Sequence, residues 1–291
     1  MELFQYPYMQ RALVGALVIG LAAPALGIYL VQRRLALIGD GVGHMALTGV
    51  GAGLLLNRSP VLVAVIVASL GAITVELVRA RGRTSGDLAL ALLFYGGIAG
   101  GVMLVGLSDS TSTSLNSYLF GSLSTISPTD LTTIVILGAA ILVTMLALRP
   151  ALFAICHDEE YARVSGLPVR ALNLLLAVAT AVTVTIAMRA VGVLLISALM
   201  VVPVAAAQQV TRGFRSTMTA AMALGLFAAG SGVYVAANAD TAPGASVVLM
   251  AIASFAVVAL GGVGWRTLRR RRVAAAVPSA VEPHEVVLSR S

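Results

Sequence analysis

Asp40 and His44 are the two residues of this sequence whose types and spacing are best suited to chemistry. They stand four residues apart, so a helix would place both side chains on one face. A carboxylate and an imidazole together form part of a ligand set for Zn²⁺, Mn²⁺ or Fe²⁺. The spacing therefore indicates part of a metal site. An alternative of equal weight is a hydrogen-bonded pair that only joins two helices.

A second polar group, residues 156–170, is the longest charged segment between two apolar runs. Its acidic residues 158–160 stand where a short helix would begin, and the helix dipole favours negative charge there. Gly166 and Pro168 would then end that helix. A short exposed helix between two apolar runs is typical of a docking element for a partner. An ordinary solvated loop is the alternative.

The chain has a single cysteine, Cys156, so no disulfide can form within it. Cys156 stands beside His157 and Asp158, and these three side-chain types would suit a metal. Neighbouring residues of a helix point in different directions around its axis, and a site in a loop would need more ligands. We therefore expect no second metal site at this position.

A third stretch, residues 116–127, follows a segment rich in serine and threonine. It is too short to cross a membrane and too apolar for a simple loop. We predict an interfacial or re-entrant segment here.

Composition shows what kind of elements must position these residues. The chain of 291 residues is 59% hydrophobic and only 11% charged, which is too little charge to cover a soluble domain. Crossing a bilayer takes about 20 largely apolar residues. Such runs lie at roughly 10–32, 36–56, 60–80, 86–107, 129–148, 171–188, 190–211, 216–237 and 246–265. We predict an all-α, polytopic transmembrane helical bundle of about nine spans, or eight if the sixth and seventh runs form one.

The positions of the arginines predict the orientation of the bundle, because basic residues gather on the cytoplasmic side. All 19 basic residues are arginines. If the N-terminus lies outside, only Arg11, Arg58 and Arg189 fall at the outer face. We therefore predict an outer N-terminus and a cytoplasmic C-terminus. The net charge of +7 then reflects topology and gives no reason to expect nucleic acid as a partner.

The absence of lysine excludes a phosphate-binding Gly-x-x-x-x-Gly-Lys-[Ser/Thr] loop. Any nucleotide hydrolysis that drives this protein must therefore take place on another chain. The first apolar run has no basic leader and no convincing cleavage site, so we do not expect a cleavable signal peptide. Localisation in the cell membrane, plasma or inner, follows from the apolar runs.

Five motifs, in order along residues 10–265, resemble those of metal-ion ABC transporter permeases of the zinc, manganese and iron type. Gly39-Asp-Gly-Val-Gly-His-Met-Ala-Leu-Thr-Gly49 is similar to the family signature Gly-Asp-x-x-x-His-x-x-Leu-x-Gly. The other four are Tyr118-Leu-Phe-Gly-Ser-Leu123, Asp158-Glu-Glu-Tyr-Ala-Arg-Val-Ser-Gly-Leu-Pro168, Val191-Gly-Val-Leu-Leu-Ile-Ser-Ala-Leu-Met-Val-Val-Pro203 and Asp240-Thr-Ala-Pro-Gly-Ala-Ser-Val-Val-Leu249. The sequence departs from the family at His157, where an aromatic is common, and at 207–209.

The resemblance implies a permease that imports a divalent metal ion as its transported substrate, with no permanently bound cofactor. Its implied partners are a second copy of the chain, a cytoplasmic ATP-binding subunit, an extracytoplasmic metal-binding protein and the lipid bilayer. It assigns the metal to Asp40 and His44. It assigns coupling to the ATPase to Asp158, Glu159, Glu160, Ala162, Gly166 and Pro168.

Two other classes of protein stay open. An ion-coupled secondary metal transporter would work without an ATPase, and it would show internal repeats and several intramembrane acids. A membrane metalloprotease would need a His-Glu-x-x-His cluster, which is absent. We expect residues 1–272 to form the permease domain, and residues 273–291, with proline and scattered charge, to form a disordered cytoplasmic tail.

Overall fold

The computed structural model describes residues 6–80, 86–108, 117–122, 126–193 and 195–276, and the elements in these ranges are α-helices. They are α1 (Pro7–Gln32), α2 (Ile38–Leu55), α3 (Pro60–Ala80), α4 (Gly86–Leu107), α6 (Pro128–Ala147), α7 (Arg149–His157), α8 (Glu159–Val164), α9 (Val169–Ala187), α10 (Ile196–Val210), α11 (Phe214–Ala239) and α12 (Pro243–Ala276). Each predicted apolar run overlaps one of these helices over most of its length. The prediction of an all-α polytopic bundle is confirmed.

Among the described residues, seven helices are long and apolar enough to cross a membrane, and α10 is a shorter apolar helix. The helix α2 has 18 residues, but its glycines and its Asp–His pair lower its hydropathy. Eight or nine spans therefore fit the described helices.

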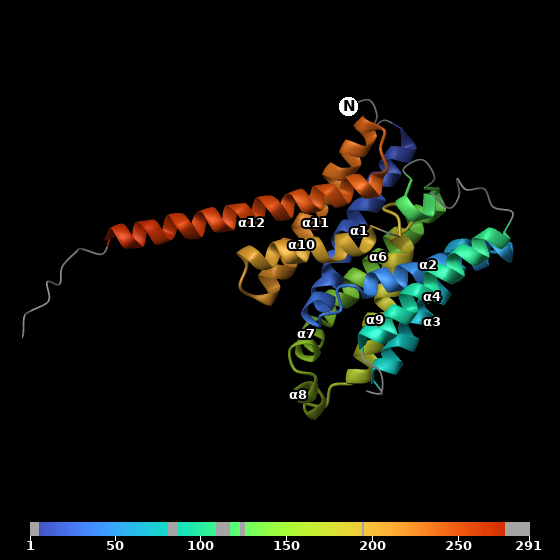
Figure 1. The fold of residues 1–291 in the computed structure, drawn as a ribbon, viewed down its shortest axis with the longest axis horizontal. Helices are drawn as coiled ribbons and strands as arrows, with labels where there is room; N and C mark the ends of the chain where they lie inside the picture. The colour runs from blue at the N-terminus through green and yellow to red at the C-terminus, as the bar shows by residue number, and fades with distance from the viewer. Residues whose placement is uncertain (1–5, 81–85, 109–116, 123–125, 194, 277–291) are drawn as a thin grey trace, which may run out of the picture.

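Two helices form the centre of the bundle. The most apolar stretch of α1 is 72% buried and that of α9 is 67% buried, whereas that of α6 is only 22% buried. On one side of this centre, α2 packs against α3 and α4; on the other, α10, α11 and α12 pack together (Figure 1). The helix α1 contacts both α10 and α11, and α9 contacts both α2 and α3.

The contact between α2 and α4 depends on a glycine. A Cβ atom added to Gly97 of α4 would lie 2.6 Å from the backbone carbon of His44, whereas one added to its neighbour Gly96 would meet no atom within 4 Å. Gly97 also accepts a 2.7 Å hydrogen bond from the hydroxyl of Thr48 through its carbonyl oxygen. Small residues at such positions let helix backbones approach closely in lipid.

The seventh predicted run differs from the structure, because its first residues are not helical. The helix α9 ends at Ala187 and α10 begins only at Ile196. The amide of Val193 donates to the carbonyl of Tyr118 at 3.0 Å, and that of Ser122 donates to the carbonyl of Arg189 at 3.2 Å. The connection thus satisfies backbone groups against a distant segment instead of along a helix, as non-helical backbone buried in a membrane protein must.

Helix ends that the arginine pattern assigns to one side of the membrane lie together. Arg33 at the end of α1 contacts both α8 and Asn173, the fifth residue of α9. At the other end of the bundle, the start of α6 contacts Arg189, just after the end of α9. This arrangement agrees with alternating helix directions, and which end faces the cytoplasm stays a prediction.

The described helix α12 continues to Ala276, past the predicted domain boundary at residue 272. Residues 277–291 lie outside the described part of the chain, so the predicted disordered tail stays a prediction.

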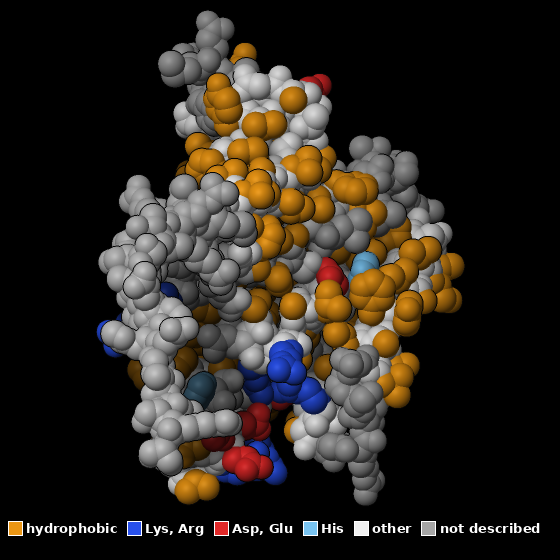
Figure 2. All heavy atoms as spheres, turned by 60° about the vertical axis from the view of Figure 1, so that its left-hand side comes forward, with side chains coloured by type: hydrophobic (Ala, Val, Ile, Leu, Met, Phe, Trp, Pro, Cys, Tyr) orange, Lys and Arg blue, Asp and Glu red, His pale blue; other side chains and the backbone are white. Residues whose placement is uncertain are grey.

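The surface has an apolar middle and a charged end. Figure 2 shows hydrophobic side chains over the middle of one face and charged side chains at its lower end, where α7 and α8 lie in Figure 1. Large apolar side chains such as Leu62, Leu92 and Val143 are exposed. Exposed apolar side chains in such numbers suit a surface that faces lipid.

The close approach at Gly97 predicts different outcomes for two neighbouring substitutions. Gly97→Ala forces a methyl group against the backbone of His44 and should destabilise the protein by about 1–3 kcal/mol. Gly96→Ala adds the same atoms to the same helix in open space and serves as the matched control. Thermal unfolding of the two purified variants in detergent measures the difference. Equal melting temperatures would contradict the packing described here.

The arginine pattern predicts where reporters fused to the chain should lie. A fusion at Ser108 should report the outer face, and a fusion at Arg212 should report the cytoplasm. One enzyme active only outside the cytoplasm and one fluorescent only inside it should give opposite signals at the two sites. The reverse pattern would invert the orientation.

Candidate functional site

Asp40 lies where two helices begin. It stands in the first turn of α2, and its carboxylate accepts a hydrogen bond from the hydroxyl of Ser197, the second residue of α10. The N-terminus of a helix favours a negative charge, and here two such ends meet at one carboxylate. The neighbouring Gly39 makes room for this approach, because an added Cβ would lie 3.1 Å from the Cβ of Ser197.

His44 lies one helical turn beyond Asp40 and is 9% exposed. Its ring packs edge-on against Phe94 of α4, with 4.4 Å between the ring centroids. Among the side chains that the structure describes, the Nδ1 atom of His44 is the one buried nitrogen or oxygen without a hydrogen-bond partner. A buried polar atom without a partner costs free energy and calls for an explanation such as a bound ion.

The predicted pair is thus present on one helix, but its ligand set is small. No group of three or more histidine, cysteine, aspartate or glutamate residues is close enough to hold a metal within the described ranges. Other donor atoms of this chain that lie beside the segment are the hydroxyl of Ser197, the carbonyl of Val193 near Gly43 and the sulfur of Met200 near Gly39.

The short helix predicted after Cys156 is present as α8. The Asp158 side chain caps its start by accepting a hydrogen bond from the amide of Tyr161 at 2.9 Å. Gly166 adopts a left-handed φ of +82° just after its end, a conformation that glycine takes without strain. The amide of the next residue, Leu167, donates to the carbonyl of Ala162 and closes the turn.

The two faces of α8 differ. Ala162 is fully buried and holds the helix against the bundle. Glu160 is exposed, as are the apolar side chains of Tyr161 (68%) and Val164 (88%). Pro168 follows as the cap of α9. The exposed face combines charge with apolar area, as a surface for a partner requires.

Cys156, His157 and Asp158 do not converge. His157 is exposed and stacks on Phe153, with 5.8 Å between ring centroids, while Asp158 caps α8. Burial raises the pKa of the Cys156 thiol to about 11, so the thiolate that a metal requires is scarce at neutral pH.

Sequence reasoning missed two residues that contact the predicted ones. Ser197 bonds to Asp40 across 157 positions of the chain, and Arg33 pairs with Glu159 across 126. Each is a polar side chain beside or within a long apolar run, and a polar residue in that position is a signal in its own right.

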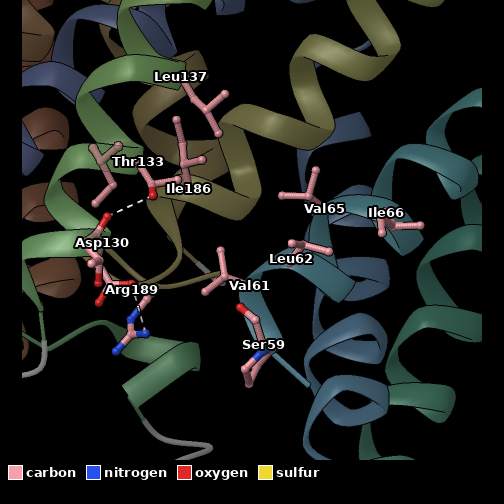
Figure 3. Close-up of a pocket in the computed structure, with 13 residues that line it drawn as sticks. Ser59, Val61, Leu62, Val65, Ile66, Asp130, Thr133, Leu137, Ile186 and Arg189 are labelled. Carbon is pink, nitrogen blue, oxygen red and sulfur yellow. Dashed lines mark hydrogen bonds and ion pairs between the residues drawn. The ribbon is translucent and has the colours of Figure 1, made fainter. Parts of the chain in front are cut away.

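A cavity of about 440 Å³ lies elsewhere, between the first turns of α3 and α6 and the end of α9. Its wall is mostly apolar, with Leu62, Ile66 and Leu137 among the lining residues (Figure 3). Asp130 and Arg189 form a 3.2 Å ion pair at one side of it. Asp40 and His44 do not line this cavity.

The bundle, with the half-buried carboxylate of Asp40 beside the buried imidazole of His44, defines a multi-pass membrane protein with a polar site inside it. The profile described as "ABC 3 transport family" matches residues 5–261. The chelated iron transport system membrane protein YfeD of Yersinia pestis is 33% identical over 89% of this chain and 86% of its own. The high-affinity zinc uptake system membrane protein ZnuB of Haemophilus influenzae is 31% identical, over 82% and 91%. The manganese transport system membrane protein MntC of Halalkalibacterium halodurans is 30% identical, over 88% of each chain.

A solved structure, PsaBC from Streptococcus pneumoniae in complex with Fab, contains a chain with the same fold. It superposes with a TM-score of 0.80 and 29% identity, over 88% of this chain and 92% of that chain. The chain belongs to the ABC 3 transport family. It is the membrane subunit of an ABC transporter, and the ATPase of that transporter is a separate protein.

Proposed function

We propose that Asp40 and His44 bind the cargo of this permease during its passage across the membrane. The chain is the permease subunit of an ABC-type uptake system for a divalent metal ion, with manganese, zinc and iron as the cargoes that its relatives' names give. Membership of the ABC 3 transport family argues against the alternative of an ion-coupled carrier that works without an ATPase.

The observation that carries the proposal is the buried Nδ1 atom of His44, which has no partner within the described structure. A neutral imidazole nitrogen is a ligand for zinc, manganese or iron. Asp40, one turn away, supplies a negative charge that two helix N-termini favour. Asp40 does join α2 to α10 through Ser197, but a pair that only joined helices would not leave the buried Nδ1 atom of His44 without a partner. We therefore infer that the pair serves as ligands.

A second copy of the chain would complete the site. Zinc in a protein takes about four ligands, whereas one described chain brings only two ionisable donors together. Two symmetry-related copies would supply two aspartates and two histidines. A site that is complete only in one arrangement of the two copies would bind the ion transiently, as conduction requires.

The exposed face of α8 is proposed as the docking element for the cytoplasmic ATPase. Its support is the exposed Glu160, Tyr161 and Val164 on a helix that Ala162 anchors to the bundle. An extracytoplasmic metal-binding protein would deliver the ion, and movement of α8 on ATP binding would switch access from one side to the other.

Loss of either ligand should stop transport without preventing insertion. Asp40→Asn and His44→Ala should each lower Mn²⁺ or Zn²⁺ uptake by about 100-fold or more, since loss of an outer partner of a ligand can already cost that much. His157→Ala, an exposed histidine outside the site, is the matched control. The measurement is uptake into cells at equal protein levels. Uptake at the normal rate in both ligand variants would contradict the assignment.

The purified complex tests docking and copy number together. Glu160→Arg reverses a charge on the exposed face of α8 and should reduce copurification of the ATPase. Arg170→Glu, an exposed charge reversal at the start of α9, serves as the control.

The mass of the wild-type complex tests the number of permease chains and should correspond to two of them. A single permease chain with bound ATPase would argue against the shared site, and undiminished copurification of Glu160→Arg would argue against docking through α8.

A further inference from the structure

We propose that Arg33 is the positioning residue through which α8 acts on the metal-binding end of α2. This inference rests on the proposed roles of α8 and Asp40. It concerns the physical connection between them, for which the fold provides a short path.

Arg33 joins three helices. It caps the end of α1, and its guanidinium donates at 2.6 Å to the Asn173 side chain of α9 and at 3.0 Å to the carboxylate of Glu159 in α8. Its side chain is only 7% exposed. The planar fork of arginine can hold two partners in one fixed geometry, which the single ammonium of lysine does not reproduce.

Glu159 makes a second ion pair that differs in its surroundings. Its other oxygen accepts from Arg163 of the same helix at 3.4 Å, and the Arg163 side chain is 67% exposed. An exposed pair within one helix contributes little. The partly buried pair with Arg33 is therefore the contact that fixes the position of Glu159 relative to the bundle.

The path from Arg33 to Asp40 is short and held by backbone hydrogen bonds. Arg34 turns the chain with a left-handed φ of 58°, and the amide of Leu35 donates back to the carbonyl of Leu30 at 2.8 Å. The amide of Ile38 then donates to the carbonyl of Leu35 at 3.0 Å, where α2 begins. The next turn carries Asp40, so movement of Arg33 moves the first turn of α2.

Arg33 thus connects α8, the proposed docking helix, to the first turn of α2, which carries Asp40. When the ATPase displaces α8, Glu159 moves with it and draws Arg33 along. This movement changes the position of the α1–α2 connection and hence the contact between Asp40 and Ser197. Coupling of this kind requires an element with two arrangements, the equilibrium between which both sites bias.

The experiment uses the full complex of permease and ATPase in liposomes, with Mn²⁺ as the transported probe. Arg33→Gln should keep the ATPase bound and hydrolysing ATP, while Mn²⁺ transported per ATP falls about tenfold. Arg170→Gln removes an exposed arginine outside α8 and should stay within about twofold of wild type. The exchange Arg33→Glu with Glu159→Arg should recover part of the ratio, because Asn173 can also donate through its amide.

A wild-type ratio of Mn²⁺ to ATP in Arg33→Gln would overturn the proposal. If Arg33→Gln lowers transport only because the ATPase no longer binds, the proposal is also overturned, and Arg33 serves only to hold α8 in place. If Arg33→Gln does not fold, Arg33→Lys keeps the charge but not the fork, and a wild-type ratio there would count against the proposal equally.

Asp40→Asn in the same liposomes distinguishes a failure of the proposed metal site from a failure of the proposed role of Arg33. If Asp40→Asn transports Mn²⁺ normally, the proposed metal site fails whatever Arg33 does. If Asp40→Asn is inactive and Arg33→Gln is fully coupled, only the role of Arg33 fails.

Discussion

A helical bundle in lipid has no water with which to satisfy a buried polar group, so each such group must find its partner within the protein. The described polar contacts follow this constraint. Arg33 lies between Glu159 and Asn173, Glu76 pairs with Arg79 at 3.0 Å, and Asp130 pairs with Arg189. His44 is the exception, because its Nδ1 atom is buried without a partner among the described side chains. A departure from a rule that the rest of the bundle obeys is the reason for assigning function to this position.

The same constraint explains why the site lies where helices begin. Helix N-termini are the part of a backbone that can stabilise an anion without another charged side chain. The non-helical connection before α10 brings one such terminus to Asp40, and Ser197 provides the hydroxyl that meets the carboxylate. A continuous helix through this connection would have no free N-terminus at that point.

Small residues make these approaches possible. Gly97 lets α4 lie on the backbone of His44, and Gly39 lets α10 lie beside α2. Because lipid provides no hydrophobic force between helices, close packing of this kind holds them together. The same close contacts mean that a displacement of one helix is passed to the next, which suits a protein whose work is to change shape under an external ATPase.

The sequence by itself determined the membrane bundle, the spacing of the pair at 40 and 44, and the short helix α8 that ends before Gly166, because these depend on composition and on spacing within a few residues. It did not reveal Ser197, Arg33 or Asn173 as members of these sites. Their contacts join positions from 126 to 157 residues apart, and local spacing carries no information about such distances. Only the tertiary structure decided that residues ahead of α10 leave the helix, because their backbone bonds to a segment near Tyr118 replace those of a helical turn.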